Sequence, residues 1–217
     1  MRQRGRSAGP ALRTVRVGEQ LYESHPDKHI RVARTLDDLM QVVAMRGAVY
    51  MAEQTCPYEE EFDGNDFAGS THLIGSFDGE PAGCIRARFF ADFAKLERLV
   101  VRAEFRHSTL AFDLVRAGIG LCRRKGYRKV YGHAQDRLVP FWKRFGARPM
   151  EPRRPLAFSD FAYTEMLLET EPHPDALSLA SDPYVLIRPE GEWDQPGVLE
   201  RSSARPVTSP IRNARAA

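Results

Sequence analysis

The chain has 217 residues, of which 42% are hydrophobic and 28% are charged. This balance indicates one globular domain with tails, or at most two small domains. No apolar run approaches the roughly 20 residues that span a bilayer. Cys56, Cys84 and Cys122 are too widely spaced for a disulfide framework or a zinc site. We therefore expect a cytoplasmic protein in a reducing compartment that holds no metal.

The net charge of +3 is unevenly distributed. Residues 1–18 carry five arginines and no acidic residue, and residues 201–217 carry four arginines and none, so the stretch between them has a net charge of −6. An acidic centre between basic tails disfavours specific nucleic-acid binding. Residues 1–28 lack periodicity and an apolar signal segment. We predict a basic disordered tail there, although an arginine-rich start without acidic residues is also typical of transit peptides.

The first predicted elements are a strand over residues 30–33 and a helix over residues 35–51. Thr35 followed by Asp38 matches a capping box. Apolar residues at helical spacing define the face expected to be buried, namely Leu36, Leu39, Met40, Val43, Gly47 and Tyr50. Residues 53–70 are acidic and lack a clear period, so we expect a functional loop with one helical turn.

A meander of three antiparallel strands is expected next. Two of them, residues 71–77 and 84–90, flank the turn DGEPAG, and the third is the KLERLVV segment at 95–101. The later elements are a helix from about residue 110 to Gly126, a strand over 129–135 parallel to the third strand, a short helix near 138–145 and a strand over 163–168. The Pro-rich remainder, 169–217, is expected to pack partly, as an extended piece at DPYVLIRPEGEW, and then to be disordered.

The strand–turn–helix of residues 95–122 is the predicted centre of the site. The first N–H groups of a helix have no partner within it, and the helix dipole favours an anion there. The loop at 106–111 (RHSTLA) is therefore a candidate phosphate site. Spacing alone does not separate this from an ordinary turn that binds nothing.

The order of elements and three motifs resemble the GNAT acetyltransferase superfamily. The strand ending in ERLVV leads into a loop in which Arg106 and Ala111 match the family pattern, while Thr109 stands where glycine is usual. The stretch EQTCPYEEEFDGNDFAGSTH is similar to the ElaA-like branch, and HAQDRLVPFWKRFGARP is similar to the usual GNAT ending. The resemblance covers about residues 30–168. It implies an α/β (α+β) GNAT fold with a central mixed, mostly antiparallel sheet and an acyl-CoA site at the strand–turn–helix.

The resemblance implies transfer of an acetyl group from acetyl-CoA to a primary amine of a small molecule or peptide, by direct attack in a ternary complex. The implied cofactor-binding residues are Leu99, Val100, Val101, Arg106, His107, Ser108, Thr109, Leu110, Ala111 and Trp142. Glu97 is the candidate general base, and His133 could serve instead. Trp142 stands where many members have a tyrosine as general acid, so Tyr131 or a water takes that role, or the thiolate is protonated without assistance.

The acidic loop is the candidate acceptor site, because carboxylates attract a cationic amine. The residues proposed for this role are Glu59, Glu61, Asp63, Asp66 and, on the next hairpin, Arg86. A solvated, charged loop is an equal alternative. The expected partner is a small-molecule amine, and we expect no specific binding of nucleic acid and no binding to a membrane. The expected oligomeric state is a monomer or a homodimer.

Two other functions stay open. The spacing of Glu61, Asp63 and Asp66, together with Arg46 and Arg86, also resembles acyl-homoserine lactone synthases, which would imply a longer acyl donor and an acylated amino acid or lactone product. Thr109 and Trp142 favour a third reading, a degenerate non-catalytic GNAT module that senses or interacts.

Overall fold

The computed structural model describes residues 13–17, 20–24, 27–153 and 155–209. The chain divides into two compact units, residues 1–176 and residues 177–217. We expected one GNAT domain over residues 29–168, between the two predicted tails. The first unit includes this range and every residue predicted for the site.

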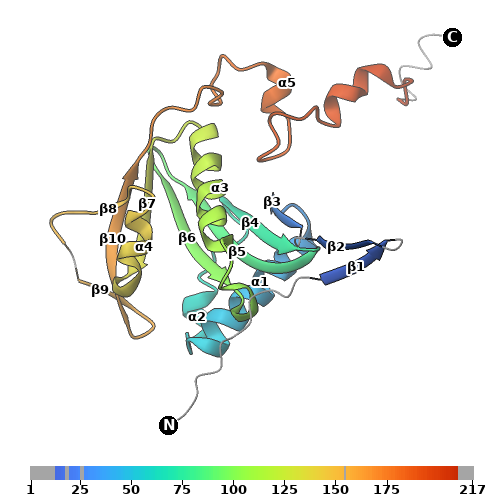
Figure 1. Ribbon diagram of the computed structural model, residues 1–217. Coiled ribbons are helices and arrows are strands. Elements are labelled where there is room, and N and C mark those ends of the chain that lie inside the picture. Colours follow the sequence, from blue (N-terminus) through green and yellow to red (C-terminus); the bar gives the residue numbers. More distant parts are fainter. Residues whose placement is uncertain (1–12, 18–19, 25–26, 154, 210–217) are drawn as a thin grey trace. The chain divides into compact units, whose positions relative to one another are not determined.

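The first unit is built on an eight-stranded mixed sheet with the order β3-β4-β5-β6-β7-β10-β8, and β9 pairs with β10 (Figure 1). The strands are β3 (Lys28–Val32), β4 (Ser70–Phe77), β5 (Glu80–Phe89), β6 (Ala94–Val101), β7 (Lys129–Gln135), β8 (Arg148–Pro149), β9 (Leu156–Phe158) and β10 (Phe161–Glu169). Within the described sheet only β6 and β7 are parallel. The mostly antiparallel sheet, the central meander and the parallel β7 are thereby confirmed.

The turn between β4 and β5 is shorter than the predicted DGEPAG. Only Asp78 and Gly79 lie outside the strands, with positive φ values of 49° and 82°. Two residues in the left-handed region close a tight hairpin, for which an Asp-Gly pair is well suited. A register shift after Gly75 then accommodates Pro81 opposite Ser76.

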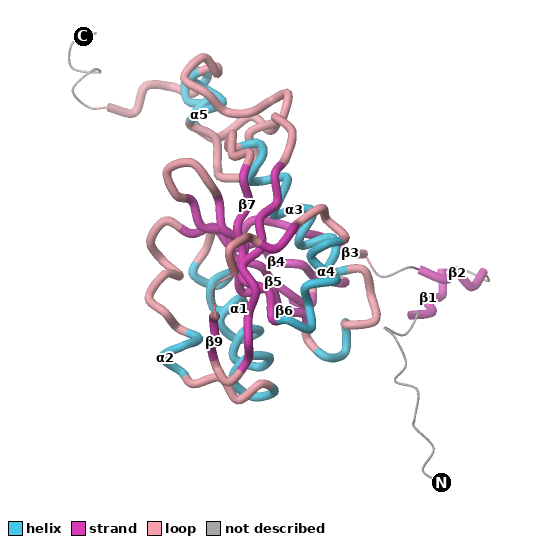
Figure 2. Tube along the Cα trace, turned by 90° about the vertical axis from the view of Figure 1, so that its left-hand side faces the viewer, coloured by secondary structure: helices cyan, strands magenta, loops and turns pink. Residues whose placement is uncertain are grey.

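Helices cover both faces of the sheet (Figure 2). On one face lie α1 (Leu36–Arg46), a π-helical turn (Gly47–Glu53) that continues it, and α2 (Tyr58–Glu61). On the other face lie α3 (Leu110–Arg124) and α4 (Val139–Lys143), preceded by 3-10 turns at Ala103–Phe105 and Asp136–Leu138. The single helical turn expected in the acidic loop is present as α2.

The prediction of which α1 face is buried was wrong. Leu36, Met40 and Val43 are exposed, with 71%, 63% and 37% of their surface accessible. The buried side chains on this segment are Asp38, Val42, Met45, Arg46 and Val49. Two of these five are charged, so hydrophobic periodicity could not mark the face.

The start of α3 lies directly on β4. A Cβ at Gly75 would lie only 2.5 Å from Leu110 Cδ1, so the absence of a side chain at Gly75 allows Leu110 to sit against the strand. Leu110, Leu114 and Leu121, which helical spacing places on one side of α3, are buried. Gly126 follows the helix with a φ of 93°, a conformation that favours glycine.

Both tails differ from the sequence expectation. β1 (Arg13–Val17) and β2 (Gln20–Ser24) form an antiparallel pair in the segment predicted to lack regular structure. In the second unit, α5 (Pro183–Leu186) interrupts the segment expected to be extended, because Asp182 caps the helix by accepting a hydrogen bond from Tyr184 N–H at 2.8 Å. A 3-10 helix follows at Leu199–Ala204. The ends, 1–12 and 210–217, lie outside the described residues.

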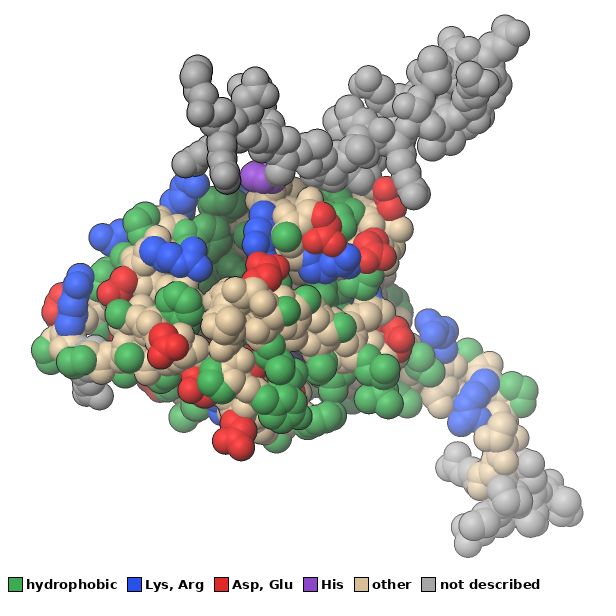
Figure 3. Space-filling view, turned by 90° about the horizontal axis from the view of Figure 1, so that it is seen from below, with side chains coloured by type: hydrophobic (Ala, Val, Ile, Leu, Met, Phe, Trp, Pro, Cys, Tyr) green, Lys and Arg blue, Asp and Glu red, His purple; other side chains and the backbone are tan. Residues whose placement is uncertain are grey.

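In the part of the chain that the structure describes, none of the helices is both long and apolar enough to cross a membrane. Figure 3 shows one face of the molecule, on which basic and acidic side chains are interspersed with apolar ones. Charge on this face is therefore mixed rather than segregated.

Candidate active site

The candidate site begins where β6 and β7 separate. Their pairing joins Ala94 to Val130 and Lys95 to Tyr131, and no further pair follows among the described residues. Figure 1 shows the two strands diverging from there. A cleft with a volume of about 450 Å³ opens between them, and the π-helical turn and α4 also line it.

A β-bulge in β6 shapes this cleft. The pairing of β5 with β6 is irregular here, and Arg98 adopts a positive φ of 54°. A non-glycine residue held in that region stores strain, which is common at functional sites. The Leu99 carbonyl leaves the sheet ladder and accepts a hydrogen bond from the Tyr50 hydroxyl at 3.0 Å. Glu97, Arg98 and Leu99 all line the cleft as a result.

A second cavity, of about 760 Å³, adjoins the cleft. The residues that line both are Tyr50, Gln54, Glu97, Arg98, His133 and Tyr163. The rest of the wall of the second cavity comes mainly from the segment around α2 and from the turn between β9 and β10. Two molecules, one in each space, would therefore meet at the shared residues.

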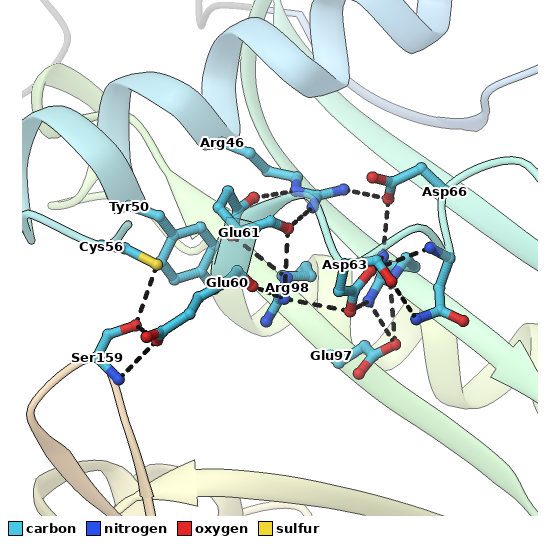
Figure 4. Close-up of polar contacts among 12 residues, drawn as sticks. Arg46, Tyr50, Cys56, Glu60, Glu61, Asp63, Asp66, Glu97, Arg98 and Ser159 are labelled. Carbon is cyan, nitrogen blue, oxygen red and sulfur yellow. Dashed lines mark hydrogen bonds and ion pairs between the residues drawn. The ribbon is translucent and has the colours of Figure 1, made fainter. Parts of the chain in front are cut away.

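Hydrogen bonds hold two walls of the second cavity together. Ser159 and Asp160 form the β9–β10 turn with positive φ values of 47° and 65°. The Ser159 N–H and hydroxyl donate to the Glu60 carboxylate at 2.9 and 2.5 Å. Ser159 Oγ also lies 3.1 Å from Cys56 Sγ (Figure 4).

Two arginines with fully buried side chains lie behind the shared residues. Arg46 binds the Glu61 carboxylate, reaches the Glu61 carbonyl at 2.8 Å and pairs with Asp66 at 2.5 Å (Figure 4). Arg86 pairs with the same Asp66 at 2.8 Å. Ionic groups of this kind remain buried only when each charge is matched and hydrogen-bonded.

Arg86 also joins the acidic loop to β6. Its guanidinium pairs with Asp63 at 2.7 Å and with Glu97 at 2.8 Å. Arg98 contacts Asp63 at 3.2 Å, so this carboxylate lies between two guanidinium groups. Glu61, Asp63 and Asp66 are therefore paired with arginines of the protein, whereas Glu59 is exposed.

Glu97 is held by two cations. Besides Arg86, Lys95 pairs with its carboxylate at 2.7 Å. Burial raises the pKa of Glu97, but the charges of Arg86 and Lys95 outweigh it and hold the pKa below its usual value. A carboxylate in this state is a weak proton acceptor.

His133 has the opposite electrostatic setting. Burial, with a smaller contribution from the charge of Lys95, lowers the pKa of His133, so the imidazole is neutral at pH 7. Tyr131 donates its one proton to Glu165 at 2.6 Å. The Tyr131 oxygen then accepts from His133 Nε2 at 2.6 Å, which leaves Nδ1 as the nitrogen that can take up a proton.

The loop before α3 is tied down by its own side chains. Arg106 donates to the Val101 carbonyl at 3.0 Å and pairs with Glu53 at 2.5 Å. Ser108 Oγ donates to the Phe105 carbonyl at 2.6 Å and accepts from Leu110 N–H at 3.2 Å. The first turn of α3 is thereby fixed with its N–H groups directed out of the helix end.

A family model described as the acetyltransferase (GNAT) family matches residues 39–147, half of the chain. The chain belongs to the GNAT family. YjcF of Bacillus subtilis (strain 168), an uncharacterized N-acetyltransferase, is 30% identical over 118 residues, which cover 54% of this chain and 83% of YjcF. These matches support an acyltransferase enzyme, as the sequence predicted.

Solved structures give the same fold. Escherichia coli ElaA has a TM-score of 0.59 at 22% identity, over 66% of this chain and 100% of ElaA. BjaI, a CoA-dependent acyl-homoserine lactone synthase solved with SAM and isopentyl-CoA, has a TM-score of 0.53 at 14% identity, over 63% of this chain and 78% of BjaI. Both families named from the sequence are thus among the structural neighbours, and the GNAT fold is confirmed.

Coenzyme A, the acyl carrier that GNAT proteins generally use, fits the residues present. The unpaired edge of β6 beyond Lys95 offers backbone groups to an extended arm. At the end of that edge, the first N–H groups of α3 suit a phosphate. The cleft connects the two, with Val101 and Ala111 among its lining residues.

The structure places the predicted cofactor residues in three settings. Those lining the cleft are Leu99, Val101, Arg106, Ala111 and Trp142. Val100 and Leu110 are buried, so they offer backbone groups only. His107, Ser108 and Thr109 form the loop itself. Their roles toward the cofactor stay predictions.

The predicted catalytic and acceptor residues are partly brought together. Glu97 and His133 line both spaces, whereas Tyr131 lines neither and contacts His133 from behind. Glu61 and Asp63 line the second cavity. The remaining acceptor candidates lie outside its lining, with Glu59 exposed on α2 and both Asp66 and Arg86 in the charge cluster behind it.

Sequence reasoning missed several residues that line the cleft or the second cavity. Gln54 and Cys56 lie in the EQ and CPY segments that carried the family resemblance, so their motif was found but no role was given to them. Tyr163 was assigned only to a strand, although its hydroxyl accepts a hydrogen bond from Gln135 at 3.3 Å beside the cleft. Ser159 showed no signal, because its contact with Glu60 spans 99 residues.

Proposed function

We propose that this GNAT protein transfers an acetyl group from acetyl-CoA to the primary amine of a small molecule. The observation that carries the proposal is the junction of two spaces, a cleft along the free edge of β6 and a second cavity, at six shared residues. The donor binds in the cleft and the amine enters from the second cavity. Direct attack in a ternary complex then needs no covalent enzyme intermediate.

Acetyl-CoA supplies a thioester as the acyl donor, and the protein positions it and moves protons. Backbone groups of residues 99–101 hold the extended arm along β6. The N–H groups at the start of α3 bind the diphosphate. A backbone N–H near the bulge at Arg98 polarises the thioester carbonyl, because a fixed dipole stabilises the negative charge that develops there.

We assign the general base to His133. Its neutral imidazole can take up a proton at pH 7, whereas Glu97 is held ionised by Arg86 and Lys95. Tyr131 and Glu165 fix the tautomer in which Nδ1 accepts the proton from the incoming ammonium, directly or through a water. Glu97 stays ionised throughout the reaction, and its ion pairs with Arg86 and Lys95 hold the side chains between the two spaces in place.

Tyr163 donates a proton to the departing thiolate. Trp142 occupies the position expected for a tyrosine, and its indole N–H is not an acid. Tyr163 lines both spaces, while Tyr131 lines neither. Tyr163 therefore suits this role better than Tyr131 does.

A reaction of the acyl-homoserine lactone synthase type has less support. The arginines that resemble those of acyl-homoserine lactone synthases, Arg46 and Arg86, are fully buried and paired with carboxylates of the same chain. Neither side chain is free to bind an acceptor in this arrangement.

Calorimetry with acetyl-CoA tests the proposal, with Arg106→Glu beside the wild type. We expect micromolar binding by the wild type and its loss in the variant, since a carboxylate beside the loop repels phosphate. An amine panel assayed by release of free thiol then defines the acceptor. A wild type that binds no acetyl-CoA, or that binds longer acyl donors much more tightly, would refute the acetyl-transfer proposal.

A further inference from the structure

Three side chains form a closed group at the start of α3. Lys28 Nζ lies 2.8 Å from Thr109 Oγ1 and 2.5 Å from Asp113 Oδ2. Thr109 Oγ1 in turn donates to Asp113 Oδ2 at 2.7 Å. Lys28 precedes Thr109 by 81 residues and belongs to β3 at the edge of the sheet. It reaches the loop because Gly75 lets the start of α3 lie against the neighbouring strand.

Asp113 is an unusual neighbour for a phosphate site. It lies in the first turn of α3, and its bond from the Thr109 hydroxyl holds the carboxylate at the residue that caps the helix. A carboxylate there interacts well with the helix dipole. The same charge repels any phosphate that approaches the N–H groups of that turn. Neutralising the charge of Asp113 therefore favours a diphosphate at the loop.

Two cations are near enough to neutralise it, and they differ in setting. Arg116 Nη1 lies 3.7 Å from Asp113 Oδ1, but 71% of its side chain is exposed, so solvent screens its charge. Lys28 makes direct bonds to both members of the pair, and 35% of its side chain is exposed. Lys28 is the cation whose position is fixed by the loop.

We infer that Lys28 is a positioning residue for the cofactor, which neutralises Asp113 and fixes Thr109 so that the loop accepts the diphosphate of coenzyme A. The inference rests on the proposed function. It also explains how a loop with threonine in place of the usual glycine stays compatible with an anion. The Thr109 hydroxyl is directed to Asp113 and Lys28 instead of into the phosphate position.

Calorimetry of the full chain with coenzyme A and with 3′-dephospho-CoA tests this. We expect Lys28→Met to weaken binding of both ligands by about tenfold, and Asp113→Asn to bind at least as tightly as the wild type. The double variant should recover to within about twofold of the wild type, because the repelling charge is then absent. Arg116→Met is the matched control, with the same charge change at the same carboxylate, and should stay within about twofold.

Four outcomes overturn the inference. Unchanged binding by Lys28→Met would do so, and so would a double variant as weak as Lys28→Met, which would mean that Lys28 does not act through Asp113. A loss confined to coenzyme A would show that Lys28 binds the 3′-phosphate directly. A wild type that binds neither ligand removes the proposed function too, whereas wild-type binding with no effect of Lys28→Met removes this inference alone.

Discussion

At the scale of a single residue, the neighbours of His133 determine the tautomer and the protonation state of its imidazole. The phenol of Tyr131 cannot donate to both of its partners, so its bond to Glu165 forces the imidazole to donate from Nε2. Burial then keeps the ring neutral. A base must be deprotonated to act, so activity should be lost as the pH falls through the lowered pKa of His133.

Replacing His133 should remove this dependence on pH. We expect His133→Gln to lower kcat/KM by about 10²- to 10⁴-fold, the usual contribution of a general base. The acid limb of the kcat/KM profile, which in the wild type should lie below pH 6.5, should disappear in the variant. Steady-state assays between pH 5 and 8 provide the measurement.

Glu97→Gln is the variant to compare with His133→Gln in the same pH-dependent assays. If Glu97 only orients the site, this variant keeps the acid limb while its rate falls. A limb that vanishes in Glu97→Gln and persists in His133→Gln would reverse the assignment of the base. Tyr131→Phe, which removes the acceptor of the Nε2 proton, should lie between the wild type and His133→Gln.

At the scale of a single element, the start of α1 is fixed by a capping box that consists of Thr35 and Asp38. The carboxylate of Asp38 accepts from the N–H groups of Arg34 and Thr35 at 2.8 and 3.0 Å, while Thr35 Oγ1 accepts from Asp38 N–H at 3.1 Å. Arg31 pairs with the same carboxylate at 2.5 Å. Burial alone raises the pKa of Asp38, but these bonds outweigh it and lower the pKa to about 2.

Removing this cap should destabilise the protein measurably. We expect Asp38→Ala to lower the free energy of unfolding by about 1–3 kcal/mol, because two backbone N–H groups lose their acceptor. The matched control is Asp37→Ala, whose side chain accepts a bond from the Gln41 side chain and, among the described residues, from no backbone N–H; it should stay within about 0.5 kcal/mol. Urea denaturation at pH 7 measures both, and equal losses in the two variants would contradict the capping argument.

The elements differ in how well the sequence predicted them, and the reason is the range of the interactions involved. The capping box of α1 and the strand at 129–135 depend on neighbouring residues, and both were found. The buried face of α1 was missed, because it includes the charged Arg46, which pairs with the Glu61 carboxylate 15 residues later in the chain. The same limit hid the contact of Ser159 with Glu60. The motif around Arg106 predicted a phosphate loop, and two of its residues, Arg106 and Ala111, line the cleft.

At the scale of the whole molecule, charged side chains join the elements around the site as apolar ones do in the core. Arg86 on β5 connects Asp63 and Asp66 of the acidic loop with Glu97 of β6. Burial raises the pKa of Asp63, but the bonds and charge of Arg86 outweigh it and lower the pKa well below its usual value. These carboxylates therefore contribute stability above their unfolded pKa of about 4, which is lost as the pH falls below it.

Arg86→Met should destabilise the protein by about 3–5 kcal/mol at pH 7, because three carboxylates lose their shared buried cation. Without Arg86 their pKa values rise, so they can be neutralised by protonation, and the penalty should shrink between pH 7 and pH 4.5. Denaturant unfolding at both pH values measures it. Arg88→Met is the matched control on the same strand, since Arg88 lies 3.9 Å from Glu97 and should cost at most about 1 kcal/mol. A penalty for Arg86→Met that equals the control, or that does not change with pH, would mean that packing and not charge joins these elements.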